Sequence, residues 1–351
     1  MFKRTADHLL DERKQVILKL VVHDYVRTAE PVASEALVNR HKLDVKSATV
    51  RNEMAEMSDM GYLRQPHTSA GRVPSDLGYR FYVDRLMSIG MLGQRERELA
   101  RSAYDETEND LERILAETCK VLSGLTKYAS VATQRSDDDV EIRHVSLTPL
   151  HTNRSLLIIV FSNGRVEHRI FRAQAAVRRD LSRVSSTLDA CLSNRSVGEI
   201  CAGPDMETPP AIAAHAEIFQ SALGHVRQVA RTLLEGGIFV DGANYILRQP
   251  EFQDVHKAEA VLDELEQRKD LFRILSVALL GPETCIVIGS ENPCVEMREC
   301  SFVASRYRIG DRLGGTIGVI GPTRMDYRRA VAAVDFMAKN LTDLLTYLSI
   351  G

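Results

Sequence analysis

The sequence is short of features that define several large classes of protein. It has no Trp, only 6% aromatic residues, and no apolar run that approaches the length of a membrane span. The chain leads from Met1–Arg4 directly into a charged segment, so it shows no apolar secretory signal. We therefore expect a cytoplasmic, globular protein. Its 351 residues, 44% of them hydrophobic, are enough for two or three domains.

Cysteine spacing and net charge exclude further classes. The six cysteines show no CxxC spacing and no His cluster; they are Cys119, Cys191, Cys201, Cys285, Cys294 and Cys300. We expect reduced thiols and no metal site. Residues 1–90 contain 14 Lys and Arg against 12 Asp and Glu, a net of +2, whereas the whole chain is at −3. This modest asymmetry argues against a strongly basic, non-specific nucleic-acid binder and favours binding that depends on sequence and dimerisation.

The most informative segment begins at Ser47 and has the pattern of an amphipathic helix. Val50, Met54 and Met57 recur at i, i+4 and i+7, which is the period of one buried helical face. The other side of this helix is short and polar, with Ser47, Ala48, Thr49, Arg51 and Asn52. Such a face suits a DNA major groove, because Asn can pair with adenine and Arg with guanine or phosphate. An ordinary solvent-exposed helix has the same pattern. The neighbouring segments are therefore needed to distinguish it from a DNA-recognition helix.

Two helices are predicted before this one. Leu9–Val26 carries apolar residues at helical spacing, and Pro31 suits the first position of a second, short helix that ends at Asn39–Asp44. Two short helices joined by a few polar residues, the second with a groove-compatible face, predict a helix-turn-helix with the Ser47–Met60 helix as recognition helix.

A small hairpin is predicted after the recognition helix. Gly61 suits a left-handed helix end, and Tyr62–Gln65 and Arg72–Val73 can pair around a small polar loop. The hairpin would be the wing, and with the helix that follows it would contact the DNA backbone through Arg64, His67, Thr68, Ser69, Gly71, Arg72 and Arg80. Ser75 is expected to cap the next helix, with Leu77, Phe81 and Leu86 pointing inward.

The remainder of the chain predicts an antiparallel sheet interrupted by a helix-rich insertion. After a linker at 88–93 and a helix at 111–125, strands are expected at 129–133, 142–147, 155–161 and 166–171, then at 285–288, 300–304 and 315–320. Asn163–Gly164 is a strong hairpin turn. Between these groups, 175–192 and 211–234 read as helices and 236–242 as a short strand. The fold class is α+β and multidomain.

No catalytic or phosphate-binding motif emerges. The glycine-rich run Gly314–Pro322 lacks the Gly-Lys-Ser/Thr and the GxGxxG spacing of phosphate loops, so we interpret it as close backbone packing, a bulge or a dimer contact. Asp137–Asp139 reads as a solvated turn. The final helix, from Arg324 onward, has a near-heptad apolar seam that packs on its own sheet or also contacts a second subunit. We predict no enzyme activity and no cofactor.

Three runs, SATVRNEM, GYLRQPHTSAGRVPSDLGYRFYVDRLM and GVIGPTRMDY, resemble the signature segments of the HrcA family of bacterial heat-inducible repressors. The resemblance spans the chain. It implies a winged-helix DNA-binding domain at 1–90, a GAF-like domain at 104–174 and 271–351, and an inserted dimerisation domain at 175–270. The segment Thr28–Glu35 departs from the family's TGEPVGSK-like run at two glycines and one basic position.

The resemblance also implies partners. In this family a homodimer represses chaperone operons by binding an inverted repeat called the CIRCE element in double-stranded DNA, and the GroE chaperonin keeps the repressor active until heat stress. A ligand-gated regulator and a GAF-containing enzyme are the alternatives. No membrane partner is expected.

Overall fold

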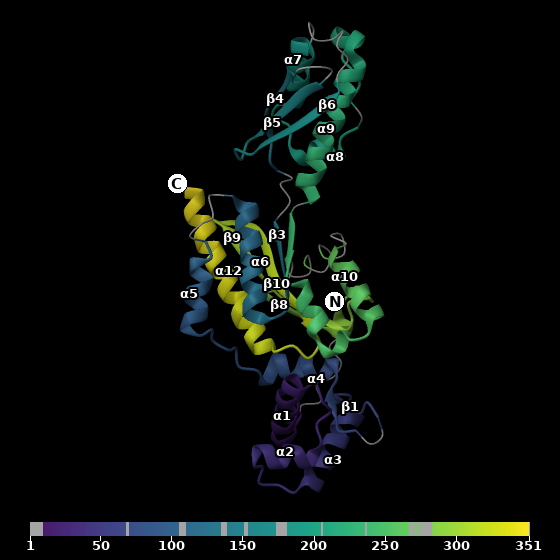
Figure 1. Ribbon diagram of the computed structural model, residues 1–351, viewed down its shortest axis with the longest axis vertical. Helices are drawn as coiled ribbons and strands as arrows, with labels where there is room; N and C mark the ends of the chain where they lie inside the picture. The colour runs from purple at the N-terminus through teal and green to yellow at the C-terminus, as the bar shows by residue number, and fades with distance from the viewer. Residues whose placement is uncertain are drawn as a thin grey trace. The chain divides into compact units, whose positions relative to one another are not determined.

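Two units divide the chain, and the second is inserted between two paired strands of the first (Figure 1). The first unit consists of Met1–Thr133 and Ile238–Gly351, and the second of Gln134–Gly237. The computed structural model describes residues 10–67, 70–104, 110–134, 139–150, 154–172, 181–204, 206–235, 237–266, 271, 275 and 283–350.

The first unit begins with what we call the N-terminal module, residues 10–87. It contains α1 (Glu12–Thr28), α2 (Ser34–His41), α3 (Ser47–Asp59), a hairpin of β1 (Leu63–Arg64) and β2 (Val73–Pro74), α4 (Asp76–Phe81) and a π-helical turn, η1 (Tyr82–Leu86). Local chemistry sets several of its ends. The Asp11 side chain accepts from the Lys14 N–H at the start of α1, Ser75 caps α4 by accepting from the Gly78 N–H, and Gly61 turns the chain after α3 with a φ of +84°. The predicted roles of Ser75 and Gly61 are confirmed.

Two local predictions in this module were wrong. Pro31 does not begin α2, which starts at Ser34; instead Val32 and Arg72 exchange two backbone hydrogen bonds of 2.9 Å beside the hairpin. Leu77, expected inside, is 47% exposed, whereas Tyr79 is buried. A Cβ on Gly78 would lie 2.1 Å from the Tyr62 carbonyl oxygen, so this backbone contact sets the rotation of α4 and turns Leu77 outward.

The rest of the first unit is built on a five-stranded sheet of order β7-β3-β10-β9-β8. Its strands are β3 (Ala129–Gln134), β7 (Ile238–Asp241), β8 (Thr284–Ile288), β9 (Cys300–Ile309) and β10 (Arg312–Pro322). The pairs β3–β7, β8–β9 and β9–β10 are antiparallel. The helices are α5 (Gln94–Ser102), α6 (Leu111–Thr126), α10 (Val255–Glu266) and α12 (Tyr327–Ile350), with short 3-10 turns η4 (Ala243–Arg248), η5 (Pro250–Phe252) and η6 (Gly289–Glu291).

Alternate residues of this sheet face two different cores. Val303, Ile317 and Val319 belong to the core formed with α6 and α12, whereas Phe302, Ala304 and Ile320 belong to the core formed with η4, η5 and α10. Figure 1 shows α6 and α12 on one side of the sheet and α10 on the other. The prediction that the final helix packs on its own sheet is thus confirmed. None of the helices among the described residues has the length and apolar composition needed to span a bilayer.

The glycine-rich strand β10 owes its composition to close backbone packing, as expected. A Cβ on Gly318 would lie 2.5 Å from the Val303 carbonyl oxygen, and one on Gly315 would lie 1.9 Å from that of Thr133. The β9–β10 register also shifts between Leu313 and Gly315, so the strand contains a bulge.

The second unit has its own sheet, which corrects the prediction of a single interrupted sheet. Strands β4 (Ile142–Pro149), β5 (Arg154–Phe161) and β6 (Val166–Arg172) form a three-stranded antiparallel sheet. The helical elements are α7 (Leu181–Leu192), α8 (Val197–Ala202), η3 (Pro210–His215) and α9 (Ala216–Glu235). The unit begins at Gln134 and ends at Gly237, whereas the predicted insertion spanned 175–270. The alternation of apolar and polar residues predicts a strand but not the sheet that it joins. This is why the predicted and observed boundaries of the insertion differ.

The close approach at Gly71 gives a test of the packing in the N-terminal module. A Cβ on Gly71 would lie 2.3 Å from the Val32 carbonyl oxygen, so Gly71→Ala should lower the free energy of unfolding by about 1–3 kcal/mol. The matched control is Gly124→Ala in α6, where a Cβ meets nothing within 4 Å; it should raise stability by about 1 kcal/mol or less. Urea unfolding followed by circular dichroism measures both, and equal stability of the two variants would contradict the packing described.

Candidate nucleic-acid interface

Helix α3 presents the polar face that its sequence predicts. Val50 and Met57 are fully buried and Met54 nearly so, which fixes the rotation of the helix. On the other side Ala48, Arg51 and Asn52 are exposed, and Ser47 and Thr49 are half-buried. The structure therefore brings these five predicted residues together on the first two turns of one helix.

The start of α3 also suits an anion. Its first turn, Ser47–Val50, contains no acidic residue, and the exposed Lys46 is the N-cap. The partial positive charge of a helix N-terminus and its unpaired N–H groups favour phosphate. The charges at this end of the helix would thus attract the phosphates of a DNA backbone.

The hairpin places some of the predicted wing residues beside α3. Arg64 and His67 are exposed, and Gly71 is half-buried against the backbone of Val32. Ala70 N–H donates to the His67 carbonyl, and the Gln65 side chain donates to the Ala70 carbonyl at 3.0 Å, so the loop is closed by its own hydrogen bonds. Thr68 and Ser69 lie outside the described residues.

Arg72 joins the hairpin to α3. Its Nε donates to the Ser58 hydroxyl at 2.9 Å, and that hydroxyl in turn donates to the Met54 carbonyl. Together with the two backbone bonds to Val32, this places Arg72 at the junction of three segments. The sequence analysis expected a phosphate contact here and missed Ser58, because nothing in the local pattern links residues 14 positions apart.

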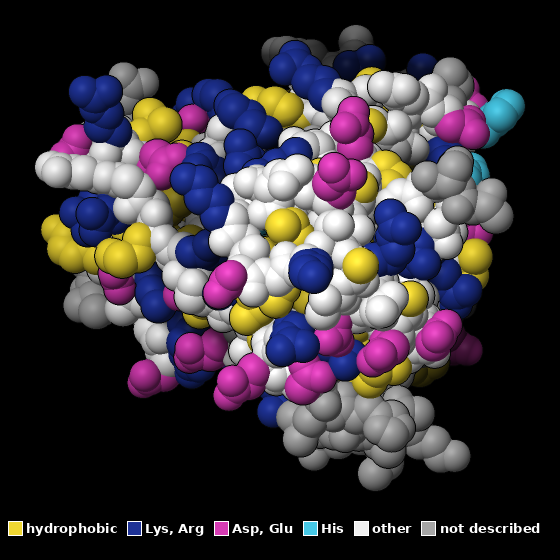
Figure 2. Space-filling view, turned by 90° about the horizontal axis from the view of Figure 1, so that it is seen from below, with side chains coloured by type: hydrophobic (Ala, Val, Ile, Leu, Met, Phe, Trp, Pro, Cys, Tyr) yellow, Lys and Arg dark blue, Asp and Glu magenta, His cyan; other side chains and the backbone are white. Residues whose placement is uncertain are grey.

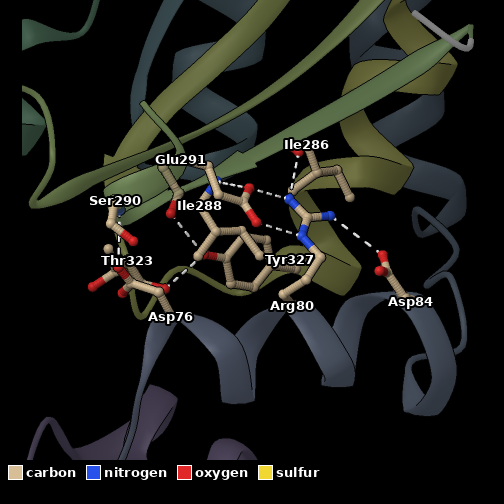
Figure 3. A network of polar contacts seen from close by, with 10 residues as sticks. Asp76, Arg80, Asp84, Ile286, Ile288, Ser290, Glu291, Thr323 and Tyr327 are labelled. Carbon is tan, nitrogen blue, oxygen red and sulfur yellow. Dashed lines mark hydrogen bonds and ion pairs between the residues drawn. The ribbon is translucent and has the colours of Figure 1, made fainter. Parts of the chain in front are cut away.

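Arg80 lies apart from the other predicted residues (Figure 3). It contacts the part of the first unit that is built on the five-stranded sheet, α5–β3 and β7–α12, which we call the five-stranded sheet domain. Its Nε donates to Glu291 Oε1 at 2.7 Å, its Nη2 donates to the Ile286 carbonyl at 2.7 Å, and Nη2 also pairs with Glu291 Oε2. Burial disfavours the charged form, but the hydrogen bond and charge of Glu291 more than offset it, so the pKa of Arg80 is raised. The guanidinium therefore forms an internal ion pair with Glu291. Glu291 is 211 positions away, so no local pattern predicts this.

Further polar contacts hold the N-terminal module against the sheet domain. The Ser290 N–H donates to the Asp76 carboxylate at 2.8 Å (Figure 3). Arg324 donates to the Val26 carbonyl at 3.0 Å and pairs with Glu251, and Arg328 donates to the Ser88 carbonyl at 2.9 Å. Arg324 falls in the GVIGPTRMDY run, so one signature segment serves to anchor the module.

Exposed basic side chains surround the α2–α3 end of the module. They are Arg40, Lys42, Lys46, Arg51 and Arg64. Figure 2, which views the molecule from this end, shows Lys and Arg side chains over much of the surface, with Asp and Glu side chains interspersed among them. The positive charge is thus moderate and mixed with acidic groups, as a net charge of +2 predicts.

The reassignment of Arg80 can be tested by stability and salt dependence together. Arg80→Ala and Glu291→Ala should each lower the free energy of unfolding, with a coupling of about 1–3 kcal/mol in the double variant. Asp84→Ala is the control: Asp84 is half-exposed and makes only an i,i+4 pair with Arg80 at 3.3 Å, so its loss should cost less than about 0.5 kcal/mol. If Arg80→Ala instead left stability unchanged and lowered the salt slope of DNA binding by about one, Arg80 would contact phosphate.

Comparisons with known proteins identify the family of this chain. The family model described as HrcA protein C terminal domain matches residues 112–331. A heat-inducible transcription repressor HrcA from Desulforamulus reducens is 37% identical over 337 residues, 96% of this chain and 97% of that protein. The repressor of the same name from Carboxydothermus hydrogenoformans is 38% identical over 338 residues, 96% of this chain and 98% of that protein.

One solved structure has a similar fold over nearly the whole chain. It is a crystal structure of a hypothetical protein at 2.2 Å resolution, with a TM-score of 0.60 and 21% identity, covering 97% of this chain and 99% of that one. This likeness concerns the fold alone. The sequence relatives are transcription repressors and not enzymes. The chain therefore belongs to the HrcA family of heat-inducible transcription repressors.

Proposed function

We propose that this protein is a cytoplasmic, homodimeric repressor of heat-shock chaperone operons that binds a CIRCE-type inverted repeat. The observation that supports it best is the exposed face of α3 with the hairpin beside it. Residues 1–90 would be a winged-helix domain, with α3 as recognition helix and the β1–β2 hairpin as wing. Two-fold symmetry of the dimer then requires two half-sites in inverted orientation.

Base recognition would come from the start of α3. Asn52 and Arg51 are exposed on one face, and Ala48 between them and the helix N-terminus is small enough to let the backbone approach. Asn paired with adenine and Arg paired with guanine are the common bidentate contacts in the major groove. Ser47 and Thr49 on the flanks would donate hydroxyl groups to the adjoining phosphates.

The hairpin would hold the DNA backbone. Arg64 and His67 are exposed at the hairpin, and Arg72 sits where the hairpin meets α3. Thr68, Ser69 and Gly71 complete the proposed wing, with Gly71 allowing the loop to pass close to Val32. In this proposal Arg72 positions the hairpin through Ser58 as well as facing phosphate, and Arg80 acts only through the anchor to Glu291.

Dimerisation is proposed for the second unit, as the inserted dimerisation domain. One face of its sheet packs on the helices through Leu157, Ile159 and Phe161. The opposite face, which we call the outer sheet face, carries an apolar cluster of Leu156, Ile158, Val160, Val166 and Ile170 on β5 and β6. His168 lies among them, and His144, Ser146 and Thr148 of β4 lie beside them. Val166 is 56% and Ile170 55% exposed. An apolar, exposed sheet face of this kind fits a second copy of the same surface.

The five-stranded sheet domain is proposed to be the GAF-like domain and to respond to the GroE chaperonin. The chaperonin would maintain the DNA-binding dimer under normal growth and would be withdrawn by unfolded proteins during heat stress. This part of the proposal rests on the family resemblance. In this proposal another protein, and not a cofactor, regulates the DNA-binding activity of the repressor.

A gel-shift titration tests the proposed function as a whole. The purified chain is titrated against an inverted-repeat operator and a scrambled duplex of equal length, at several salt concentrations, with and without GroE chaperonin. We expect selective binding of the inverted repeat that becomes tighter with chaperonin. Absence of any shift at low salt in both conditions would refute the proposal.

Asn52 provides a sharper test of base recognition. Asn52→Ala should weaken binding to the inverted repeat by about 1–3 kcal/mol and leave binding to the scrambled duplex nearly unchanged, because base contacts carry sequence preference. Asn39→Ala, an exposed Asn at the end of α2, is the matched control and should not change the ratio of the two affinities. Equal loss on both duplexes would show that Asn52 does not read a base.

The outer sheet face provides a test of dimerisation. Ile170→Lys should place a charge in the proposed interface and convert the dimer to a monomer in analytical ultracentrifugation, with loss of operator binding. Leu247→Lys replaces a similarly exposed apolar residue, 52% exposed, in the first unit and should leave the dimer intact. A dimer that survives Ile170→Lys with unchanged affinity would place the interface elsewhere.

A further inference from the structure

Two histidines and a buried aspartate meet where α1 and α2 end. His23 and Asp24 lie near the end of α1, and His41 is the last residue of α2. His41 Nε2 lies 3.0 Å and His23 Nδ1 3.5 Å from the same carboxylate oxygen, Oδ1 of Asp24. Together the three ligand atoms lie within 4.8 Å of one another.

We propose that His23, Asp24 and His41 form a binding site for a divalent transition-metal ion, with Zn²⁺ the best fit. Zinc takes His nitrogen and carboxylate oxygen at about 2.0–2.2 Å in tetrahedral geometry, which puts neighbouring ligand atoms roughly 3.4 Å apart. The two measured separations from Asp24 Oδ1 bracket that value. Small rotations of the two rings would bring all three atoms to bonding distance, with water as the fourth ligand.

The carboxylate is held in the orientation that such a site needs. Arg40 Nη1 donates to the other oxygen, Oδ2 of Asp24, at 2.7 Å, which leaves Oδ1 facing both imidazoles. Ligating carboxylates in metal sites are usually hydrogen-bonded from behind in this way. Arg40 is 48% exposed, so solvent screens part of the charge that it places beside the carboxylate.

The aspartate is buried and both of its oxygens have partners. Asp24 is 1% exposed, with Arg40 on one oxygen and the two imidazoles on the other. A carboxylate and two imidazoles are donor types that zinc prefers.

The site is open to an ion from outside. The His23 side chain is 49% exposed and that of His41 is 19% exposed, so solvent reaches both imidazoles. A bound ion would cross-link α1 to α2, on which α3 packs, and would thereby stabilise the N-terminal module.

The described residues hold one other group of possible ligands, and it is less suited. Cys294 lies near Glu264 and Glu296, a group with one thiol, two carboxylates and no imidazole. Zinc sites are built mainly from Cys and His ligands, so we expect weaker binding there. A test of the His site nevertheless has to control for it.

The experiment uses the full chain freed of metal by a chelator. Zn²⁺ binding is measured by isothermal titration calorimetry, and the visible d–d absorption of Co²⁺ reports on ligand geometry. Variants His23→Ala and His41→Ala remove one ligand each. His144→Ala is the matched control, since His144 Nδ1 lies 3.1 Å from Asp189 and the described residues form no metal-ligand group there. Cys294→Ser controls for the thiol group.

We expect one ion per chain and a weakening of at least about 10–100-fold in His23→Ala and His41→Ala, the range found for loss of even an outer-shell partner. His144→Ala and Cys294→Ser should bind as the unaltered chain does. Zn²⁺ should raise Tm only where the site is intact, and affinity should fall at lower pH because ligation requires neutral imidazoles.

Three results would overturn the proposal: no uptake by the unaltered chain, unchanged affinity in both His variants, or loss of binding in Cys294→Ser. His23→Ala keeps the Asp24 contacts to His41 and Arg40, so it should fold, and its circular dichroism verifies this. Because no DNA is present in these measurements, the outcome is independent of the proposed repressor function.

Discussion

The ion pair between Arg80 and Glu291 holds the N-terminal module to the five-stranded sheet domain. Both side chains are partly withdrawn from water, which costs free energy unless their remaining hydrogen-bonding groups are also satisfied. They are satisfied here: Arg80 donates to the Ile286 carbonyl as well, and Glu291 accepts from the Ile288 N–H at 2.8 Å. The contact therefore fixes the relative orientation of the two side chains as well as their separation, because a guanidinium donates hydrogen bonds only in its own plane. Together with the contacts of Asp76 and Arg324, it sets the orientation of the N-terminal module, and so of α3, on the sheet.

A second constraint lies where the insertion leaves the sheet. Strands β3 and β7 flank the second unit in sequence and pair directly, with Ser130 opposite Asp241. Asp241 also accepts from the Ser123 hydroxyl of α6 at 2.5 Å, and the Ser130 hydroxyl donates to the Cys119 carbonyl at 2.6 Å. These bonds tie both ends of the insertion to one helix. The chain thus leaves and re-enters the first unit at two neighbouring, paired strands.

Features governed by local chemistry were predicted well from the sequence. The buried face of α3, the cap at Ser75, the turn at Gly61 and the Asn163–Gly164 hairpin all follow from side-chain period or backbone preference within a few residues. Pro31 and Leu77 were predicted wrongly because neighbours distant in sequence overrode the local preference. Arg72 contacts Val32 through the backbone, and the close approach of Gly78 to Tyr62 rotates α4.

The residues that connect the parts of the molecule could not be predicted in the same way. Arg80 has the local pattern of a phosphate-contacting residue, yet its partner is a glutamate far along the chain. His23 and His41 carry no recognisable ligand spacing, and they meet at Asp24 only because α1 and α2 cross there. Likewise, alternation predicted β4, β5 and β6 as strands but could not assign them to a separate sheet. Amino-acid order alone indicated the family resemblance, most of the helices and strands, and the polar face of α3, since these depend on short-range periodicity and motif. Tertiary packing alone decided which charges pair, which strands share a sheet and where the histidines gather, because those depend on contacts between segments that no local pattern relates.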